Sequence, residues 1–424
     1  MLKRKLLTDL KAHLDRKEIS LIVGPRQAGK TTLMSMLRKE LQRRGFKTLF
    51  LSLDFESDQP FFQSQKNLLQ KIRLELGEGP GYVFIDEIQR KDNAGLFLKG
   101  IFDMNLPYKF IVSGSGSMEL KEKIHESLLG RKRLFELDTL SFEEFVNFRT
   151  QYRYGDRLPD FFQIEKTAAR HLLQEYIMFG GYPRVVLEAE LSEKIRIIDE
   201  IYRSFLERDI SYLLRIEKPE AFSALIRLTA SQIGKLVNYS EISSTLGLAL
   251  KTVQNYLWYA EKTFVLRRVA PFFRNIRKEV TKSPVYYFTD LGLRNYCLGI
   301  FGATAPHTEM GFLFQNFIFN LLREKLTFTP AELHFWRTKN KAEVDFVVEM
   351  GENLIPIEVK YRQLERPRFG RSLRSFINKY KPRVAYIVNL SLEAQQEVGS
   401  TKVLFLPYHH LMLQPPSFLY QHTP

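Results

Sequence analysis

Cysteine is almost absent from this sequence, with Cys297 the single one among 424 residues. A disulfide framework and a zinc site built on cysteines are therefore excluded, and the composition suits a reducing environment. Long apolar runs are also missing, so no segment approaches the ~20 residues of a membrane-spanning helix. The basic start, Met1 to Lys5, is not followed by the apolar segment and cleavage site of a signal peptide. We expect a cytoplasmic, soluble protein that does not bind membranes.

Acidic residues are outnumbered, because 63 Lys and Arg face 48 Asp and Glu, which leaves a net charge of +15. Such a charge attracts polyanions, and nucleic acid is the first candidate. A basic surface that only keeps the protein soluble is the alternative. The length of 424 residues exceeds one ordinary core, so we expect two to four domains.

The strongest motif is ISLIVGPRQAGKTTLMSML, which begins at Ile19. An apolar strand over 19–23 runs into a loop of the form GxxxxGK[ST], and a helix follows. Backbone N–H groups and the positive helix end surround phosphates in such a loop, so the sequence predicts ATP binding. Lys30 would reach the outer phosphates, and the Thr31 hydroxyl would ligate Mg²⁺. The predicted nucleotide-binding residues of the loop are Gly24, Pro25, Arg26, Gln27, Ala28, Gly29, Lys30, Thr31 and Thr32.

A second apolar strand, Tyr82 to Ile85, ends in Asp86 and Glu87. In this architecture Asp86 would hold the Mg²⁺ ion, and Glu87 would polarise the attacking water. The alternative is that the two acidic residues simply end a strand and have no catalytic role. The phosphate loop upstream makes this alternative weaker. A third strand, KFIVSGSGS, ends in polar residues, and Ser113 is placed to sense the γ-phosphate. The polar stretch after it could also be a plain turn.

Arg131 follows a predicted helix end and precedes a predicted strand over 134–137. Ser141 with Glu144 then predicts a capping box at the start of the next helix. Between the fourth helix and the fifth strand of the core, Arg131 is similar to the arginine finger that ring-forming AAA+ ATPases insert into a neighbour's site. Arg133 is the second candidate, and a solvated basic loop is an equal alternative.

The order of the motifs resembles one protein family. The phosphate loop, hhhhDEIQ, GSGS, LLGR, LSFEEF and FGGYPRVV follow one another, as in prokaryotic AAA+ ATPases with a C-terminal domain of unknown function. The resemblance covers essentially the whole chain. It implies that Pro183, within GGYP, belongs to the element by which related lid domains pack near the adenine. Arg184 could act as a second phosphate sensor, although we favour an exposed residue at a helix start.

From Ala221 onward the apolar spacing predicts helices, and a helix, a turn at Gly247 and a second helix follow. The second helix would present four polar residues: Lys251, Thr252, Gln254 and Asn255. Its inner face would carry Val253, Leu257 and Ala260. Residues 261–282 hold seven Lys or Arg against two Glu. The resemblance implies a winged helix, whose polar side chains suit base or phosphate contacts. A protein-docking or ring-packing module is the alternative.

Near the C-terminus, AEVDFVV and LIPIEVKY alternate with period two, which predicts two strands joined by a turn at 351–352. In this register Asp345 lies opposite Glu358, and Glu343 lies opposite Lys360. Facing carboxylates repel each other across a strand pair. Because cross-strand Cβ atoms are ~5 Å apart, Asp345 and Glu358 could share one Mg²⁺, which would remove the repulsion. Lys360 could orient water or stabilise developing charge.

The pattern Asp-x(12)-Glu-x-Lys resembles the restriction-endonuclease-like, PD-(D/E)XK, core. The resemblance implies that Asp345 and Glu358 bind metal and that Lys360 assists. That fold usually supplies a further Glu from the preceding helix, where Gln315 stands here, and this departure puts cleavage in doubt. Residues 361–383 carry eight Lys or Arg against one Glu, which predicts a phosphate-contacting surface or, alternatively, a solvated charged helix.

We therefore predict an α/β protein in four parts: a P-loop AAA+ ATPase core over 1–160, a helical lid over 161–216, a winged helix-turn-helix over 217–302, and a restriction-endonuclease-like α/β domain over 303–424. With ATP and Mg²⁺ as cofactors, it would hydrolyse ATP to bind and remodel duplex or branched DNA. We expect a homo-oligomer, with a hexameric ring as one form. One alternative is a nucleotide-gated, Mg²⁺-dependent DNA nuclease. The other is an ATP-driven signalling or assembly switch without DNA.

Overall fold

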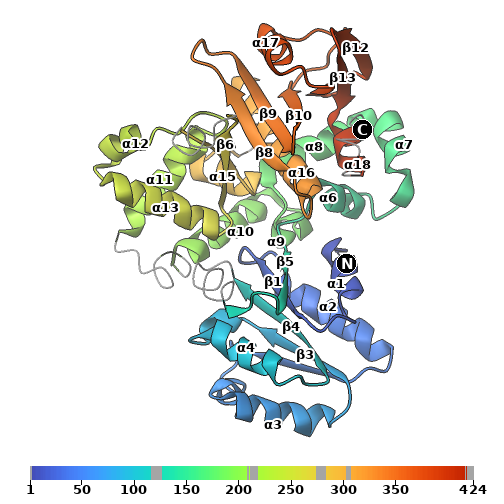
Figure 1. The fold of residues 1–424 in the computed structure, drawn as a ribbon, viewed down its shortest axis with the longest axis vertical. Helices are drawn as coiled ribbons and strands as arrows, with labels where there is room; N and C mark the ends of the chain where they lie inside the picture. The colour runs from blue at the N-terminus through green and yellow to red at the C-terminus, as the bar shows by residue number, and fades with distance from the viewer. Residues whose placement is uncertain are drawn as a thin grey trace. The chain divides into compact units, whose positions relative to one another are not determined.

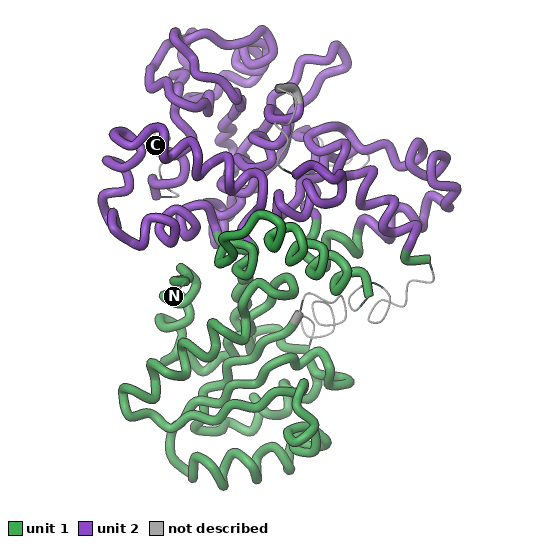
Figure 2. Tube along the Cα trace, turned by 180° about the vertical axis from the view of Figure 1, so that it is seen from behind, with its two compact units in different colours: residues 1–140, 182–219, 258–265 green, residues 141–181, 220–257, 266–424 purple. Residues whose placement is uncertain are grey.

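The computed structural model describes residues 2–115, 127–207, 210, 218–273, 283–301, 307–415 and 417. They form two compact units (Figures 1 and 2). Unit 1 comprises residues 1–140, 182–219 and 258–265, and unit 2 comprises residues 141–181, 220–257 and 266–424. The boundaries of the four predicted domains stay a prediction. No helix in the described ranges is long and apolar enough to cross a bilayer.

Unit 1 is built on a five-stranded sheet in the order β2-β3-β4-β1-β5, and all neighbouring strands are parallel. Its strands are β1 (Ile19–Gly24), β2 (Thr48–Ser52), β3 (Gly81–Asp86), β4 (Tyr108–Ser115) and β5 (Lys132–Glu136). Its helices include α1 (Leu6–Ala12), α2 (Lys30–Arg43), η1 (Gln59–Phe62), α3 (Gln65–Leu76), η2 (Ile88–Arg90), α4 (Ala94–Asp103), α9 (Pro183–Leu187) and α10 (Leu191–Ser204). The predicted parallel α/β core is confirmed.

Helices cover both faces of this sheet. One apolar cluster joins α1 and α2 to the sheet, and another joins α3 and α4 to it (Figure 1). Coverage of both faces explains why the strands are continuous apolar runs. On α2 the buried face uses Leu33, Met34 and Leu37, whereas Met36 is only half-buried. Met36 instead lines the cleft described below.

Unit 2 begins with helices that pack through aromatic rings. These are α6 (Phe142–Arg149), η3 (Gly155–Arg157), α7 (Leu158–Ile164) and α8 (Lys166–Phe179). The predicted capping box of Ser141 and Glu144 starts α6. Phe142 then contacts rings from well-separated parts of the chain: Phe162, Tyr176, Phe317 and Tyr408. This aromatic cluster ties residues 141–181 to the C-terminal part of unit 2.

The middle of the chain contains a helix-turn-helix. Its elements are α11 (Pro219–Ser231), α12 (Tyr239–Leu246), α13 (Leu250–Lys262), β6 (Leu266–Pro271), β7 (Val285–Phe288) and α15 (Leu291–Leu298). Gly247 ends α12 in the left-handed conformation, as a tight turn requires. The predicted inner face of α13 is buried: Val253, Leu257 and Ala260. Part of the predicted basic wing, residues 274–282, lies outside the described residues.

The C-terminal part forms a mixed sheet that includes β6 and β7, in the order β12-β13-β11-β10-β9-β8-β6-β7. Its elements are α16 (His307–Leu326), β8 (Glu332–Arg337), β9 (Glu343–Met350), β10 (Asn353–Val359), α17 (Arg371–Tyr380), β11 (Val384–Asn389), β12 (Ala394–Val398), β13 (Thr401–Pro407) and α18 (Tyr408–Leu413). The parallel pair β6–β8 makes this sheet continuous with the β6–β7 hairpin.

Candidate functional site

The phosphate-loop motif folds where β1 meets α2. Gly29 has a φ of +95°, which suits glycine, and α2 begins at Lys30. Gly24 lacks room for a side chain, since a Cβ there would lie 2.0 Å from the Leu137 carbonyl oxygen. The buried Lys30 amine donates to the carbonyl oxygens of Gly24 at 3.0 Å and Pro25 at 2.8 Å. The loop therefore wraps around the Lys30 amine at the positive end of α2.

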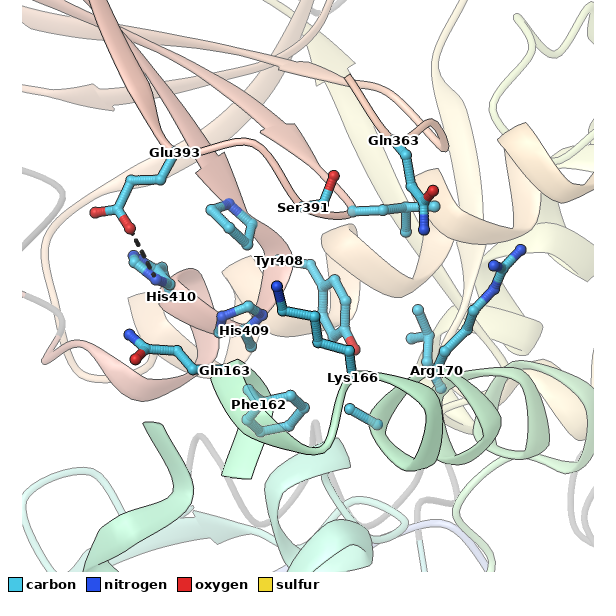
Figure 3. A pocket seen from close by; sticks show the side chains of 14 residues that line it. Phe162, Gln163, Lys166, Arg170, Gln363, Ser391, Glu393, Tyr408, His409 and His410 are labelled. Atoms are coloured by element: carbon cyan, nitrogen blue, oxygen red, sulfur yellow. Dashed lines mark ion pairs between the residues drawn. The ribbon is translucent and has the colours of Figure 1, made fainter. Parts of the chain in front are cut away.

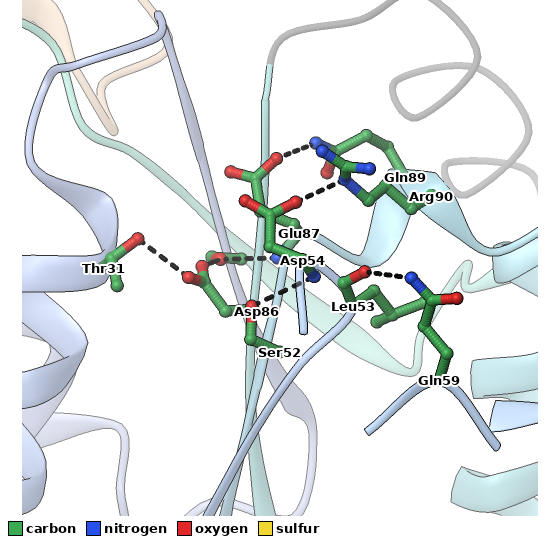
Figure 4. Close-up of polar contacts among 10 residues, drawn as sticks. Thr31, Ser52, Leu53, Asp54, Gln59, Asp86, Glu87, Gln89 and Arg90 are labelled. Carbon is green, nitrogen blue, oxygen red and sulfur yellow. Dashed lines mark hydrogen bonds and ion pairs between the residues drawn. The ribbon is translucent and has the colours of Figure 1, made fainter. Parts of the chain in front are cut away.

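Asp86 lies at the end of β3, between two hydroxyl groups. The Thr31 hydroxyl donates to Asp86 Oδ2 at 2.8 Å (Figure 4), and the Ser113 hydroxyl donates to Asp86 Oδ1. The parallel pairing of β3, β4 and β1 brings these side chains to one sheet edge. The structure thus brings together Thr31 and Asp86, the two residues predicted to hold Mg²⁺, along with the predicted sensor Ser113.

Glu87 is held in an unusual conformation beside Asp86. Its φ of +57° is rare for a residue with a side chain. The Gln89 amide donates to its carboxylate (Figure 4), and its backbone N–H donates to Ser113 Oγ at 3.4 Å. Burial raises the pKa of Glu87, while nearby Lys30 acts in the opposite direction. The sequence did not single out Gln89, because a polar residue after a strand gives no sign of which group its side chain will contact.

A cleft of about 720 Å³ lies between Glu87, the phosphate loop and the start of α9. Its lining includes Lys30, Glu87, Pro183, Arg184 and Arg4. Pro183 Cγ lies 3.8 Å from the Cβ position of Gly29. Arg184 donates to the Gln27 side chain at 3.1 Å and pairs with Glu200 at 3.0 Å. The GGYP segment therefore reaches the phosphate loop, and this cleft has the size of a small-ligand site.

Arg4 also belongs to this cleft, although nothing in the sequence singled it out. Its guanidinium donates to the carbonyl oxygens of Ala28 at 2.9 Å and Asp138 at 2.6 Å. It thereby ties the N-terminal segment to the phosphate loop and to the residues that follow β5. Arg4 is one of several basic residues at the N-terminus, and no sequence motif distinguishes it from the others.

The two arginine-finger candidates do not line this cleft. Arg131 Nε donates to Asp103 Oδ1 at 2.7 Å, in a partly exposed ion pair. The Arg133 guanidinium lies over the Phe135 ring, 5.6 Å from its centre. A finger acts on a neighbouring chain, so the assignment of Arg131 stays a prediction.

The C-terminal carboxylates meet in unit 2. Asp345 Oδ1 accepts from the Gln315 amide at 3.0 Å, and Oδ2 accepts from the Val359 N–H at 2.7 Å. Lys360 Nζ lies 2.5 Å from Glu358 Oε1. Glu358 is 7% exposed, and its other oxygen, Oε2, is buried and has no hydrogen-bond partner among the residues that the structure describes. Four residues singled out from the sequence thus lie together, with one unsatisfied carboxylate oxygen among them.

The hairpin register is partly as predicted. Asn353 pairs with Met350 and Ile357 pairs with Phe346, around the predicted turn at 351–352. The β9–β10 ladder ends at Phe346 and Ile357, so it contains neither expected cross-strand pair, Asp345 with Glu358 or Glu343 with Lys360. Beyond that point β10 continues its pairing with β11. Glu343 instead pairs with Arg337 on β8, at 3.3 Å.

Burial dominates the electrostatics of this second site. It raises the pKa of Asp345 to about 7, a shift that the Val359 N–H and Lys360 oppose. Burial also raises the pKa of Glu343. Within the described part of the chain, no three His, Cys, Asp or Glu residues are grouped to hold a metal. A metal here would therefore have two carboxylates and the Gln315 amide oxygen as candidate ligands.

Comparison with known families identifies the first segment. Residues 16–146 match a family model described as an AAA domain. The chain carries an AAA domain. Two further matches, residues 170–304 and residues 310–409, are to domains of unknown function. The recognition drawn from the motif order, an AAA+ protein with a C-terminal domain of unknown function, is confirmed.

Two relatives of this chain are named only as uncharacterised proteins. One from Mycobacterium tuberculosis is 29% identical over 377 residues, which cover 88% of this chain and 76% of the relative. Another from Methanocaldococcus jannaschii is 25% identical over 414 residues, covering 95% and 88%. Among solved structures, the chain is similar to the Aeropyrum pernix ORC1 protein in complex with DNA, at 12% identity and a TM-score of 0.30, covering 69% of this chain and 91% of that one.

Proposed function

We propose that the AAA domain binds and hydrolyses ATP. The observation that carries this proposal is the meeting of Lys30, Thr31 and Glu87 in one cleft of nucleotide size, with Asp86 bonded to Thr31 behind it. Hard oxygen donors such as the Thr31 hydroxyl and the Asp86 carboxylate suit Mg²⁺. Bound Mg²⁺ would neutralise charge on the β- and γ-phosphates.

The chain's own residues would then divide the work. Lys30 would exchange its bonds to the loop carbonyls for bonds to phosphate oxygens. Glu87 would accept a proton from the attacking water, a task for which its raised pKa places it closer to neutral pH. Gln89 would orient the Glu87 carboxylate through the hydrogen bond between them. Ser113 bonds Asp86, so it would act on the phosphate end of the cleft.

We further propose that unit 2 binds DNA and that the ATP cycle remodels it. On α13 the predicted contact residues Lys251 and Gln254 are exposed, while Thr252 and Asn255 are half-buried. Helix α17 buries Leu373, Phe376 and Ile377 on one face. Its other side and the preceding segment expose five cations: Arg366, Arg368, Arg371, Arg374 and Lys379. These two surfaces and the net charge of +15 support phosphate contacts.

ATP turnover tests both steps. The assay compares the wild type with Lys30→Ala, each alone and with single-stranded, duplex or branched DNA. We expect turnover in the wild type, stimulation by DNA at low salt, and loss of turnover in Lys30→Ala. DNA binding should weaken steeply as salt rises. Turnover without DNA binding or stimulation would refute the DNA step alone. ATP-dependent assembly in its place would favour a signalling switch.

A second candidate function is metal-dependent DNA cleavage. The buried Glu358 Oε2 without a hydrogen-bond partner favours it, because such an atom is costly unless a cation or water satisfies it. Asp345 and Glu358 would hold the ion, and Lys360 would stabilise charge on the cleaved phosphate. Cleavage in Mg²⁺ or Mn²⁺ that is lost in both Asp345→Ala and Lys360→Ala would support this function. An intact substrate under both ions would refute it.

We also propose that the chain assembles into a homo-oligomer, with Arg131 reaching the nucleotide of a neighbour. Arg131 would have to leave Asp103, which costs little for a partly exposed ion pair. Light scattering with and without a non-hydrolysable ATP analogue measures the assembly. A monomer under both conditions would refute the proposal.

A further inference from the structure

Unit 2 contains a cavity of about 450 Å³ whose lining includes neither Asp345 nor Glu358 (Figure 3). One wall comes from the end of α7 and the first turns of α8. The opposite wall comes from the segment after β11 and from the junction of β13 with α18. Both walls belong to the same compact unit. Neither the nucleotide site nor the proposed DNA surfaces account for this cavity.

Positive charge gathers along one wall of the cavity. Lys166 and Arg170 rise from the same face of α8, one turn apart, and both line the cavity (Figure 3). Lys166 also opens the 14-residue helix α8, which has no side-chain cap, so unbonded N–H groups add positive potential there. The single carboxylate of the lining, Glu393, is 64% exposed and lies 3.7 Å from the His410 ring. The lining therefore favours an anion.

Two nearly buried polar groups also face this cavity. His409 is 9% exposed and Tyr408 is 4% exposed, and both line the cavity. Among the described residues, no protein group hydrogen-bonds the His409 ring nitrogens or the Tyr408 hydroxyl, and these atoms are not among the fully buried unpartnered ones, so they reach the open space of the cavity. The His409 ring stacks on Phe162, with 4.9 Å between ring centres and 4° between planes. The two nearly buried rings therefore present polar atoms that are free to bond an occupant of the cavity.

Burial keeps the side chains of His409 and Tyr408 neutral. It lowers the pKa of His409 to about 3, with His410 as the second cause. The His409 ring is therefore neutral at pH 7, with one nitrogen that donates and one that accepts. Burial raises the pKa of Tyr408 above its usual range, so its hydroxyl remains a donor. The back of the cavity thus offers neutral donors and an acceptor, whereas the α8 wall offers cations.

We propose that this cavity binds a phosphorylated small molecule of mononucleotide size. Lys166 and Arg170 contact the phosphate, and His409 and Tyr408 bond the polar remainder. A volume of about 450 Å³ is too large for a phosphate ion alone, and it lies within the range of small-molecule sites. The Ser391 hydroxyl and the amides of Gln163 and Gln363, which also line the cavity, supply further bonds to a sugar or base.

Calorimetric binding of adenosine monophosphate tests this proposal on the full-length chain. Lys30→Ala is the background, because it removes the phosphate contact of the AAA domain. We expect one site per chain, and weaker binding of inorganic phosphate and of adenosine. Adding Lys166→Ala and Arg170→Ala should weaken binding at least tenfold, since a charge-assisted bond to each cation is lost. Both side chains are exposed, so folding should be unaffected.

Arg227→Ala is the matched control, because Arg227 is an exposed arginine of unit 2 on α11, outside the cavity lining. It should leave the affinity unchanged. Ser391→Trp, which fills the cavity from an exposed position, should abolish binding without changing the melting temperature. The proposal is overturned if no binding occurs up to millimolar concentration, or if the double variant binds as tightly as its background. Failure here leaves the ATPase proposal untouched, since no turnover is measured.

Discussion

The two units each place a pair of carboxylates near strand ends, but they satisfy these carboxylates in opposite ways. In unit 1, Asp86 accepts from the hydroxyls of Thr31 and Ser113, and Glu87 accepts from Gln89. In unit 2, Asp345 accepts from an amide and a backbone N–H, while Glu358 keeps one buried oxygen without a partner. The first pair lies beside a cleft of about 720 Å³.

The difference teaches what each pair can do. Hydroxyl and amide partners hold Asp86 and Glu87 in place, which suits the proposed roles of these carboxylates toward a phosphate-bound cation and a water. The second pair is more strongly desolvated, as the pKa of about 7 for Asp345 indicates. A bound cation would offset the desolvation free energy by pairing with both carboxylates. Unit 1 therefore holds its carboxylates in the positions that the proposed ATP hydrolysis needs, whereas the carboxylates of unit 2 form a site that a cation would stabilise.

Of the substitutions that test this comparison, Lys30→Ala should cause the largest change, a loss of ATP turnover. Lys30 supplies the one buried ammonium at the phosphate loop, so its removal should lower ATP turnover by about 10²–10³-fold. Phosphate release in a coupled assay measures this change. Lys39→Ala on the exposed side of α2 is the control, and equal losses in the two variants would contradict the assignment.

Glu87→Gln should lower turnover by about 10²-fold or more while ATP binding persists, because a general base is lost but the phosphate contacts remain. Equilibrium binding of a fluorescent ATP analogue, beside the turnover assay, separates these effects. In the wild type, turnover should fall on acidification at a higher pH than an ordinary glutamate would show, since burial raises the pKa of Glu87. A profile flat down to pH 4.5 would exclude Glu87 as the base.

Asp345→Asn should change how stability depends on pH. Because the folded pKa of Asp345 is about 7 against an ordinary 3.8, its stabilising contribution is present below pH 4 and is lost as pH rises to 7. The variant should thus gain stability relative to wild type across that window, by about 4 kcal/mol. Thermal unfolding at pH 4, 5.5 and 7 measures it. A difference that is constant with pH would contradict the pKa.

Gln315→Glu should add a third carboxylate beside Asp345 and raise affinity for a divalent cation about tenfold. Without metal the same change should lower stability, because like charges then meet in a buried site. Melting temperatures in EDTA and in Mn²⁺ give both results from one variant. Gln163→Glu, on an exposed side chain elsewhere in unit 2, is the control. If Mn²⁺ changes the melting temperature of neither the wild type nor Gln315→Glu, the metal-site proposal is refuted.

Arg131→Ala should have the smallest effect on folding, because ion pairs as exposed as its pair with Asp103 contribute little to stability. If Arg131 acts on a neighbour's nucleotide, turnover should still fall in the assembled protein while binding of ATP persists. Arg133→Ala serves as the comparison. Unchanged turnover in Arg131→Ala would remove it as the finger.

Local patterns determined much of what is observed. The phosphate loop, Asp86 and Glu87 are contiguous motifs whose chemistry depends on neighbours in the sequence, and the capping box at Ser141 is equally local. Alternation and a turn at 351–352 were enough for the register of β9 and β10 up to Phe346 and Ile357. These features could be predicted because backbone geometry links residues a few positions apart.

Other features depended on contacts between distant segments. Glu343 does not meet Lys360 because the β9–β10 ladder ends at Phe346 and Ile357, beyond which the Val359 N–H bonds the Asp345 side chain. Glu343 pairs with Arg337 on β8, a contact that no hairpin pattern contains. Arg4 at the phosphate loop and Gln89 on Glu87 carry no motif, since their roles depend on where a single side chain points. The cavity between α8 and α18 is formed by residues more than two hundred positions apart. The sequence alone thus determined the nucleotide-binding motif and the strand register, whereas tertiary packing decided which buried polar atoms remained unsatisfied, because desolvation depends on every segment that covers them.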